Sequence, residues 1–409
     1  MSDGFTSEFF AGNRERLRQL FTGTAPIVVT ANGLLQKSSD NTFAFRQDSN
    51  FWYLTGINDP DIVLVIDKEK EYLIIPTRDY FREAFDGALV PETLTRKSGV
   101  EKVLEDKEGW RQLETRLKRA KHVATLGAAP VYAEWHGFYS NPARAELIQR
   151  LKTFNEEIEI LDLREHLASM RVIKQPQELA AIQKAIDATI DAVKYVTAKS
   201  RLSKYEYEYE IEADISRHFR RAGLQHAFDP IVASGERACQ IHALANDGKL
   251  AADELLMFDI GAEVDYYAAD ISRTLPLSSF SNRQKAVYDA VCDAQDFAYS
   301  LLKPGCNYRE YEKAIEAFVG EKLRELGLIK IIDHDSVRHY FPHATSHFLG
   351  LDAHDVGDYK GEFAAGMVLA VEPGIYIPEE GIGVRIEDDV LITADGYEVL
   401  TARLPRQLS

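Results

Sequence analysis

Residues 258–276 read FDIGAEVDYYAADISRTLP, and this stretch decides how the second part of the chain folds. Two strand-like runs flank a short connection, the pattern of a β-hairpin. If the hairpin turns at Val264-Asp265, then Asp259 and Asp270 face each other across it. Facing residues have Cβ atoms about 4.5 to 5.5 Å apart, and two buried carboxylates that close repel unless a cation lies between them. The hairpin therefore predicts a metal site, with a solvated acidic hairpin as the alternative.

A second hairpin places two further carboxylates opposite each other. A turn at Glu379-Glu380 makes Glu372 and Glu387 facing partners within apolar strands. Pro373 can introduce a bulge that shifts this register by one residue. The two strand-like runs are 367–376 and 383–393. A second opposed carboxylate pair strengthens the prediction of a metal site.

Three of the 11 histidines lie within twelve residues, at His343, His347 and His354. His343 and His347 have the spacing of a helical zinc pair, but Ala344 stands where that motif requires glutamate. The cluster is therefore interpreted as part of the carboxylate site.

Charge balance indicates how many ions the site holds. Four carboxylates match the charge of two divalent cations, whereas a single cation would leave a surplus of buried negative charge. Oxygen ligands with one imidazole favour manganese, cobalt or iron over a structural zinc. Two ions about 3.5 to 4 Å apart form the hydrolytic site of aminopeptidases and phosphatases. We expect two divalent ions on Asp259, Asp270, His347, Glu372 and Glu387.

The composition is that of an ordinary globular protein, with 409 residues, 45% hydrophobic and 28% charged. The formal net charge of -17 argues against a nucleic-acid or anionic-membrane partner. Cys239, Cys292 and Cys306 show no CxxC spacing and fit free thiols in a reducing cytosol. No signal-peptide pattern and no apolar run of about 18 residues occur. We therefore expect a cytoplasmic protein.

The chain divides near residue 170 into two parts of different patterning. The first alternates helices with strands and is expected to be an α/β domain over residues 1–170. Within it, the aromatic run Asn50–Thr55 is expected to be a strand. The second part, residues 171–409, is expected to be α+β, with helix pairs and paired strands. Its expected helices are 176–196, 206–222, 283–302 and 308–326.

The motifs resemble those of the pita-bread metallopeptidases, and of the Xaa-Pro aminopeptidases (aminopeptidase P) within them. The resemblance is carried by the hairpin above and by HATSHFLGLDAHDVG, VEPGIYI and GVRIEDDVLIT, at 343–357, 371–377 and 383–393. The N-terminal FRQDSNFWYLTGINDPDIVLVI, 45–66, is similar to the aminopeptidase P N-terminal domain. The resemblance implies a pita-bread catalytic domain at 171–409 and hydrolysis of the bond before a proline at position two.

The resemblance also implies a role for each ligand. Asp270 and Glu387 would bridge two ions, manganese being the expected metal, and Asp259 would complete one coordination shell. His347 and Glu372 would complete the other. A hydroxide bridging the ions would attack the substrate carbonyl.

Further residues match substrate-contacting or catalytic positions of the family. His242, in SGERACQIHA, matches a substrate-contacting histidine, and His343 and His354 match catalytic histidines beside the metals. Tyr376 and Arg385 match residues near the proline subsite. Glu372 would transfer the proton of the attacking hydroxide or water. The resemblance also implies a homodimer or homotetramer. The chain departs from the family at Phe85-Asp86-Gly87-Ala88, at Ala243 and in a short loop, 376–381.

Two alternative functions stand beside this one. A prolidase, which cuts only Xaa-Pro dipeptides, shares the fold and the ligands, so the products from a tripeptide and a dipeptide distinguish the two enzymes. A non-catalytic pita-bread binding module belongs to another class. Such modules lose metal ligands, whereas all five are present here.

Overall fold

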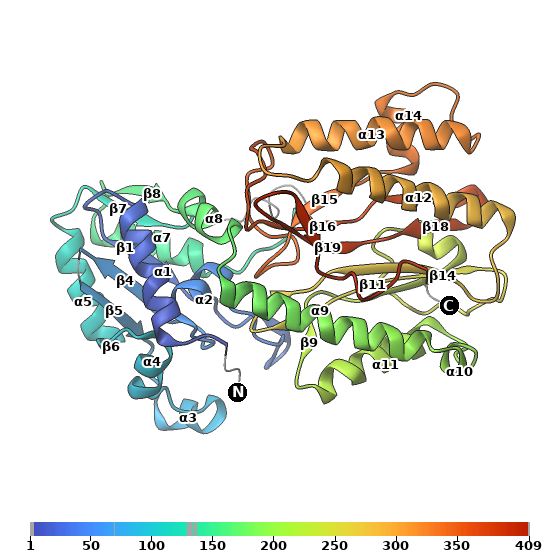
Figure 1. The fold of residues 1–409 in the computed structure, drawn as a ribbon. Helices are drawn as coiled ribbons and strands as arrows, with labels where there is room; N and C mark the ends of the chain where they lie inside the picture. The colour runs from blue at the N-terminus through green and yellow to red at the C-terminus, as the bar shows by residue number, and fades with distance from the viewer. Residues whose placement is uncertain (1–3, 69, 129–132, 134–136, 408–409) are drawn as a thin grey trace. The chain divides into compact units, whose positions relative to one another are not determined.

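The structure is a computed structural model that describes residues 4–68, 70–128, 133 and 137–407. The chain divides into two compact units, Met1–Met170 and Arg171–Ser409 (Figure 1). Each unit is built around its own strands.

The first unit contains a six-stranded mixed sheet in the order β6-β5-β4-β1-β7-β8. β4 pairs antiparallel with both β1 and β5, whereas β7 pairs parallel with β1 and β8. Apolar side chains of β1, β4 and β5 pack with those of helices α5 and α7 to form the core. The elements are α1 Ser7–Leu20, β1 Ile27–Thr30, β2 Gln36–Ser38, β3 Asn41–Thr42, α2 Ser49–Thr55, β4 Val63–Asp67, β5 Lys70–Ile75, α3 Tyr80–Asp86, α4 Pro91–Ser98, β6 Val103–Glu105, α5 Asp106–Leu117, β7 His122–Thr125, α7 Ala143–Phe154, β8 Glu159–Asp162 and α8 Arg164–Val172.

The expected strand at Asn50–Thr55 is wrong, because these residues form helix α2. Asp48 begins the helix by accepting hydrogen bonds from the backbone N–H groups of Asn50 and Phe51, both at 3.0 Å. Gly56 ends it in the left-handed conformation, with φ of 65°. Every residue from 50 to 55 is buried, so no helical alternation of polar and apolar residues marks the segment.

The second unit has strands between two pairs of helices (Figure 1). α9 and α11 lie on one side, and α12 and α13 lie on the other. The strands form sheets β10-β11-β14, β13-β12-β9, β15-β16-β19-β20 and β17-β18. The elements are α9 Pro176–Thr197, α10 Lys199–Leu202, α11 Glu208–Arg221, β9 Gln225–His226, β10 Ile231–Ser234, η1 Gly235–Cys239, β11 Leu255–Ile260, β12 Ala262–Val264, β13 Tyr267–Ala268, β14 Ile271–Pro276, α12 Asn282–Leu301, α13 Tyr308–Glu325, α14 His334–Tyr340, β15 Ser346–Phe348, β16 Val368–Val371, β17 Gly374–Ile377, η2 Pro378–Glu380, β18 Ile382–Arg385, β19 Asp388–Ile392 and β20 Tyr397–Val399.

The first hairpin turns one residue later than expected. Asp265 and Tyr266 form the turn with φ of 51° and 69°, the left-handed conformations of a type I′ hairpin. Asp259 therefore faces Ser272, and the expected pairing with Asp270 is wrong. The register shifts by two residues, which is one full period of side-chain alternation, so the Asp270 side chain stays on the expected face of the hairpin. A bulky residue such as Tyr266 rarely adopts a positive φ, so the sequence does not indicate this turn.

The register of the second hairpin is confirmed. Val371 pairs with Asp388 before the interruption, and Gly374 pairs with Arg385 after it. The register is the same on both sides, so Pro373 breaks the ladder without shifting it. Glu372 and Glu387 occupy facing positions in the gap between these ladders.

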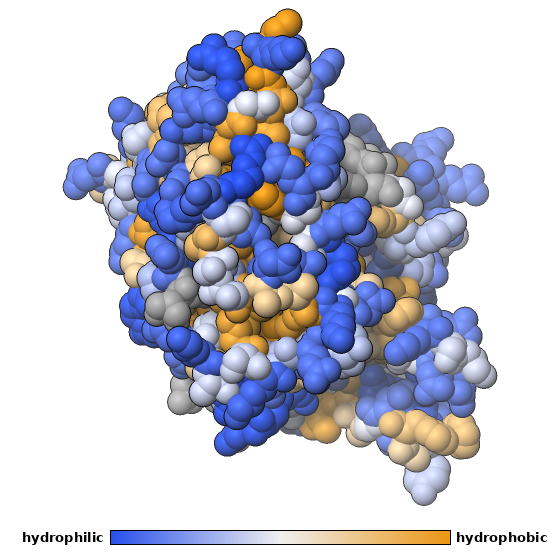
Figure 2. Space-filling model, turned by 90° about the vertical axis from the view of Figure 1, so that its right-hand side faces the viewer, coloured by the Kyte–Doolittle hydropathy of each residue, from blue (hydrophilic) through white to orange (hydrophobic). Residues whose placement is uncertain are grey.

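Hydrophilic residues cover most of the face shown in Figure 2, and hydrophobic residues form separate small patches on it. Among the residues that the structure describes, no helix is both long enough and apolar enough to cross a membrane.

Candidate metal centre

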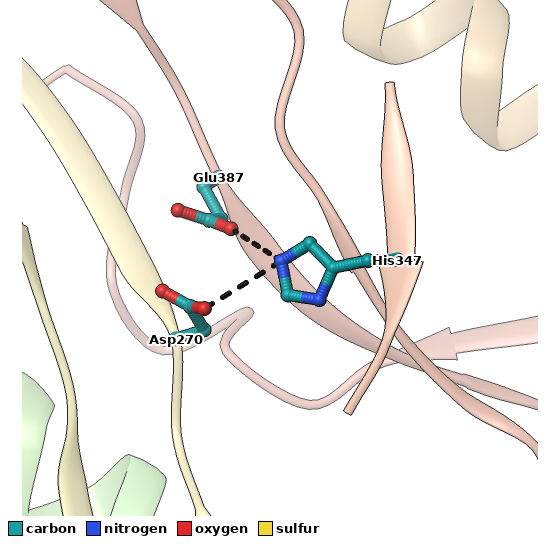
Figure 3. A group of neighbouring side chains, drawn as sticks. All are labelled: Asp270, His347 and Glu387. Atoms are coloured by element: carbon teal, nitrogen blue, oxygen red, sulfur yellow. Dashed lines mark ion pairs between the residues drawn. The ribbon is translucent and has the colours of Figure 1, made fainter. Parts of the chain in front are cut away.

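Three buried side chains from separate strands meet in the second unit. His347 lies in β15, Asp270 directly precedes β14, and Glu387 directly precedes β19. The Nε2 atom of His347 lies 3.6 Å from Asp270 Oδ2 and 3.7 Å from Glu387 Oε1. Figure 3 shows this nitrogen directed at both carboxylates. The three potential ligand atoms lie within 4.8 Å of one another, which is close enough to share a metal ion.

Interruptions in the strands aim these carboxylates inward. The expected continuous strands are each broken, between β13 and β14, between β16 and β17, and between β18 and β19. The backbone N–H groups at the breaks find partners elsewhere. Asp270 donates to Asp389 Oδ2 at 3.1 Å, Glu372 to the Thr345 carbonyl at 2.7 Å, and Glu387 to the Ser272 carbonyl at 3.1 Å. The breaks therefore leave no donor of these three residues unpaired.

Glu372 and Asp259 extend the cluster. Glu372 Oε1 lies 3.7 Å from His347 Nε2. Asp259, in β11, accepts a hydrogen bond from Arg385 Nη2 at 2.8 Å. The structure thus brings three of the expected ligands, Asp270, Glu372 and Glu387, around His347 and places Asp259 at the side of Arg385.

Burial, together with the proximity of the other carboxylates, raises the pKa values of this cluster. Burial, followed by the charge of Glu387, raises the pKa of both Asp270 and Glu372 well above the usual range. Burial also raises the pKa of Asp259 and Glu387, with Arg385 acting in the opposite direction on both. So many carboxylates in one buried space cannot all ionise unless additional positive charge is supplied.

His347 is arranged as a neutral ligand. Its Nδ1 atom lies 3.1 Å from the Phe348 carbonyl oxygen, which can only accept a hydrogen bond. Nδ1 therefore carries the proton, and Nε2 presents a lone pair to the carboxylates. Burial lowers the pKa of His347, which favours the same neutral form.

Arg385, Tyr376 and His343 form a chain of hydrogen bonds leading from Asp259. Arg385 Nη1 donates to the Tyr376 hydroxyl at 2.9 Å, and that hydroxyl lies 2.8 Å from His343 Nε2. Because His343 Nδ1 contacts the Ala344 carbonyl at 2.8 Å, Nε2 is the acceptor. Burial lowers the pKa of His343 to about 3. Arg385 and Tyr376 are both buried, so each acts on protein groups at the cluster.

The remaining two histidines are more exposed. The rings of His354 and His347 lie 4.1 Å apart between centroids, so His354 is beside the cluster. His242 lies in a turn after η1, and η1 packs against β18. Among the described residues, no hydrogen bond or ion pair joins the His242 ring to the cluster. The structure therefore brings together all the expected site residues except His242.

The site fits a divalent cation. Asp259 Oδ1 and Asp270 Oδ1 are buried without a hydrogen-bond donor among the residues that the structure describes. An orphaned buried carboxylate oxygen is unfavourable, and a cation would provide the missing partner for both. Carboxylate oxygens with a single imidazole are a donor set suited to such an ion.

Two residues that support the site were not expected from the sequence. Ser272 Oγ donates to Glu387 Oε2 at 2.7 Å and accepts from Arg385 Nε at 2.9 Å. It lies two residues after Asp270, so strand alternation could have indicated it. Glu312, on α13, accepts from the Thr345 and Ser346 N–H groups at 2.8 and 3.1 Å. Burial raises its pKa to about 7; no local pattern indicates its contact with a segment 33 residues away.

Comparison with known proteins shows the family of the chain. Residues 180–394, more than half of the chain, match the model of metallopeptidase family M24. The chain belongs to metallopeptidase family M24. Residues 10–124 of this M24 member match the aminopeptidase P N-terminal domain.

Relatives of this M24 member resemble it over nearly its full length. The Xaa-Pro aminopeptidase of Haemophilus influenzae is 34% identical, covering 91% of this chain and 89% of the relative. That of Escherichia coli is 31% identical, covering 100% and 97%. The structure of Escherichia coli aminopeptidase P with the inhibitor Pro-Leu matches with a TM-score of 0.84 and 30% identity, covering 99% of this chain and 97% of that chain. The recognition of the family and the two-part fold are confirmed.

Proposed function

We propose that this protein is an Xaa-Pro aminopeptidase, which hydrolyses the peptide bond between an N-terminal residue and a following proline. The observation that carries the proposal is the buried cluster of carboxylates around His347 Nε2. The protein's membership of a metallopeptidase family and its Xaa-Pro aminopeptidase relatives support peptide hydrolysis as the reaction. The inhibitor Pro-Leu of the Escherichia coli protein begins with proline, as the second product of such a cleavage would.

The proposed ligands divide between two ions. Asp270 and Glu387 would be shared, Asp259 would bind one ion, and His347 and Glu372 would bind the other. Manganese suits this mainly oxygen donor set. When bound, the ions would activate a water molecule and polarise the substrate carbonyl.

The remaining steps belong to the side chains of this chain. Glu372 would take a proton from the attacking water and return it to the leaving proline nitrogen. Its carboxylate is 16% exposed and lies 3.6 Å from His343 Nδ1, so it is reachable from outside the cluster. His354 and His242 would donate hydrogen bonds to the developing oxyanion and to the substrate. Arg385 and Tyr376 would shape the proline side of the site by fixing Asp259 and His343.

Cleavage of matched peptides tests the proposal. Xaa-Pro-Yaa, Xaa-Ala-Yaa and Xaa-Pro should be incubated with the manganese-loaded protein and the products separated by mass spectrometry. We expect release of the first residue from Xaa-Pro-Yaa and far slower reaction of Xaa-Ala-Yaa. Equal rates on the two tripeptides would indicate a general aminopeptidase. Cleavage of the dipeptide alone would indicate a prolidase.

The proposal includes a metal stoichiometry and an assembly state. Elemental analysis of the purified protein should find two divalent ions per chain, and a value near one would remove the two-ion assignment. We further propose a cytoplasmic homodimer or homotetramer: three free cysteines fit a reducing compartment, and most soluble oligomers are symmetric assemblies of one kind of chain. Sedimentation equilibrium would show a single chain mass if the assembly is absent.

A further inference from the structure

A fully buried group of charges lies beneath the loop that carries His354. Asp355 is 1% exposed, the Arg171 side chain 2% and the Lys174 side chain 0%. Arg171 Nη2 donates to Asp355 Oδ1 and, at 2.8 Å, to Asp352 Oδ2. Lys174 Nζ lies 3.4 Å from Asp355 Oδ2. Both oxygens of the Asp355 carboxylate therefore face a cation from the segment that begins the second unit.

The same aspartate closes the loop through its backbone. The Asp355 N–H donates to the Phe348 carbonyl at 2.8 Å, which brings the two ends of the 348–355 loop together. Tyr359 donates from its hydroxyl to the Asp355 carbonyl at 3.3 Å. His347 and His354 occupy the positions directly before Phe348 and directly before Asp355. The closure therefore sets the distance between the proposed metal ligand and the proposed oxyanion donor.

Gly350 shows how closely the carboxylate fills the loop. A Cβ atom on Gly350 would lie 2.0 Å from Asp355 Oδ2 and 3.1 Å from Lys174 Cε. Only glycine fits there, and the reason is space rather than backbone conformation. The Gly350 carbonyl in turn accepts from Ala268 N at 2.9 Å, which ties the loop to the hairpin that leads to Asp270.

Stability alone does not account for the buried charges of Asp355, Arg171 and Lys174. Removing ions from water is costly, and apolar replacements of buried ion pairs are often neutral or stabilising. The geometry here instead gives directed hydrogen bonds at a loop between two site histidines. A fixed orientation matters for catalysis, because displacement of a reacting group by 1 Å can cost about 10²-fold in rate.

We propose that Asp355, held by Arg171 and Lys174, is a positioning residue that orients His354 over the metal centre. The inference rests on the proposed function, since His354 acts there on the substrate. Asp355 touches no substrate in this assignment and works through the His354 loop.

A mutant cycle tests the proposal. Asp355→Asn, His354→Ala and the double variant should be compared for kcat, KM and bound metal. We expect Asp355→Asn to lower kcat about 10- to 100-fold with KM within threefold and both ions retained. In the His354→Ala background the same change should cost less than threefold. A purely structural role would lower activity by the same factor in both backgrounds, and that result would overturn the proposal.

Hydrogen exchange of the 348–357 segment gives a readout that does not depend on turnover. Exchange of this segment should accelerate in Asp355→Asn and stay unchanged in the matched control Asp358→Asn, whose exposed carboxylate accepts a hydrogen bond from the Lys360 N–H group within its own turn. If wild type cleaves no Xaa-Pro peptide but this exchange pattern appears, the proposed function fails, while the role of Asp355 in holding the 348–355 loop is supported. Unchanged exchange in Asp355→Asn would show that Asp355 does not hold this loop and would overturn the proposal.

A second variant guards against misfolding of Asp355→Asn. Arg171→Lys keeps the buried positive charge but cannot bridge Asp352 and Asp355 with one planar group. It should give the same pattern, with a kcat loss that disappears in the His354→Ala background. An unaltered kcat in a well-folded Arg171→Lys protein would contradict the proposal.

Discussion

Glu71 in the first unit is a partly buried carboxylate and Asp270 in the second is a buried one, and their pKa values move in opposite directions. Burial acts to raise the pKa of Glu71, but Arg14, at 2.7 Å, and Arg18 outweigh it and hold the value below the usual range. Burial and the charge of Glu387 both raise the pKa of Asp270.

The difference lies in whether the chain provides the cation. Asp48, which begins α2 and is 6% exposed, is also paired, since Arg144 Nε donates to it at 2.9 Å. In the metal centre, Arg385 pairs with Asp259 alone among the four carboxylates. Glu71 and Asp48, which serve the fold, each have an arginine partner, whereas Asp270, Glu372 and Glu387 have no arginine ion pair among the described residues, which leaves that position to an ion.

Removing the ion should produce the largest effect. Treatment with EDTA is expected to reduce peptidase activity to background. Without the ions the carboxylates would lack a counter-charge, and the attacking water molecule would not be activated. Manganese or cobalt should restore activity. Full activity in a sample shown by elemental analysis to be metal-free would refute the metal assignment. Ion pairs of the first unit should be unaffected.

Asp270→Asn should separate metal binding from stability. The variant should lose most activity and bound metal, and it should lose more than Asp259→Asn, because no arginine in the described part of the chain pairs with Asp270. In metal-free protein at pH 8 we expect its free energy of unfolding to rise by on the order of 1 to 3 kcal/mol, since one uncompensated charge is removed.

The gain in the free energy of unfolding expected for metal-free Asp270→Asn should depend on pH. The pKa of Asp270 is raised in the folded protein, so stability is present below the unfolded-state pKa and is lost as the pH rises through the folded-state value. The gain from Asp270→Asn should therefore vanish below about pH 4. Asp259→Asn should bring no such gain, because it leaves Arg385 without its carboxylate partner. Urea unfolding of metal-free samples at several pH values measures both, and an equal gain in the two variants would contradict the comparison.

His354→Ala should affect turnover without altering the charge of the cluster. Loss of one donor to an oxyanion costs about 10²- to 10³-fold in turnover, roughly 2.7 to 4 kcal/mol. We expect two retained ions and a KM near that of wild type. Metal content, melting temperature and steady-state kinetics should be measured on one preparation. Turnover within about threefold of wild type, a change of roughly 0.65 kcal/mol, would show that His354 has no catalytic role.

Glu71→Gln should give the smallest effect on activity and the opposite sign on stability. It leaves the fully buried Arg14 side chain without its carboxylate, so we expect a loss of about 1 to 3 kcal/mol in the free energy of unfolding, reduced by the partial exposure of Glu71. Because the Glu71 pKa is lowered, this loss should appear above the unfolded-state pKa and disappear as pH falls through the folded-state value.

A matched control keeps the last prediction specific. Glu114→Gln removes a partly exposed carboxylate that pairs with the exposed Lys118 one helical turn away, and it should cost less than about 0.5 kcal/mol. Activity per folded molecule should equal wild type in both variants. A stability gain in Glu71→Gln, like that expected for Asp270→Asn, would remove the distinction between the two kinds of carboxylate.

Short-range patterns in the sequence sufficed for part of this protein. The register that sets Glu372 opposite Glu387 follows from turn composition and alternation, and it survives the break at Pro373. Helices α9, α12 and α13 follow from apolar spacing with a proline or a capping residue at the start. Each of these depends on residues within a few turns of chain, where local geometry dictates which side chains share a face.

Tertiary structure alone decided the rest. The 50–55 run is a helix capped by Asp48, and its complete burial in the folded unit removes the periodicity that would have indicated it. Asp259 faces Ser272 because Tyr266 accepts a left-handed turn. Arg385 reaches Asp259 across 126 positions of sequence, and Arg171 reaches Asp355 across 184. Such contacts depend on which surfaces meet after folding. Local sequence therefore specifies which carboxylates can lie near one another, and only packing determines which of them receive a cation from the chain.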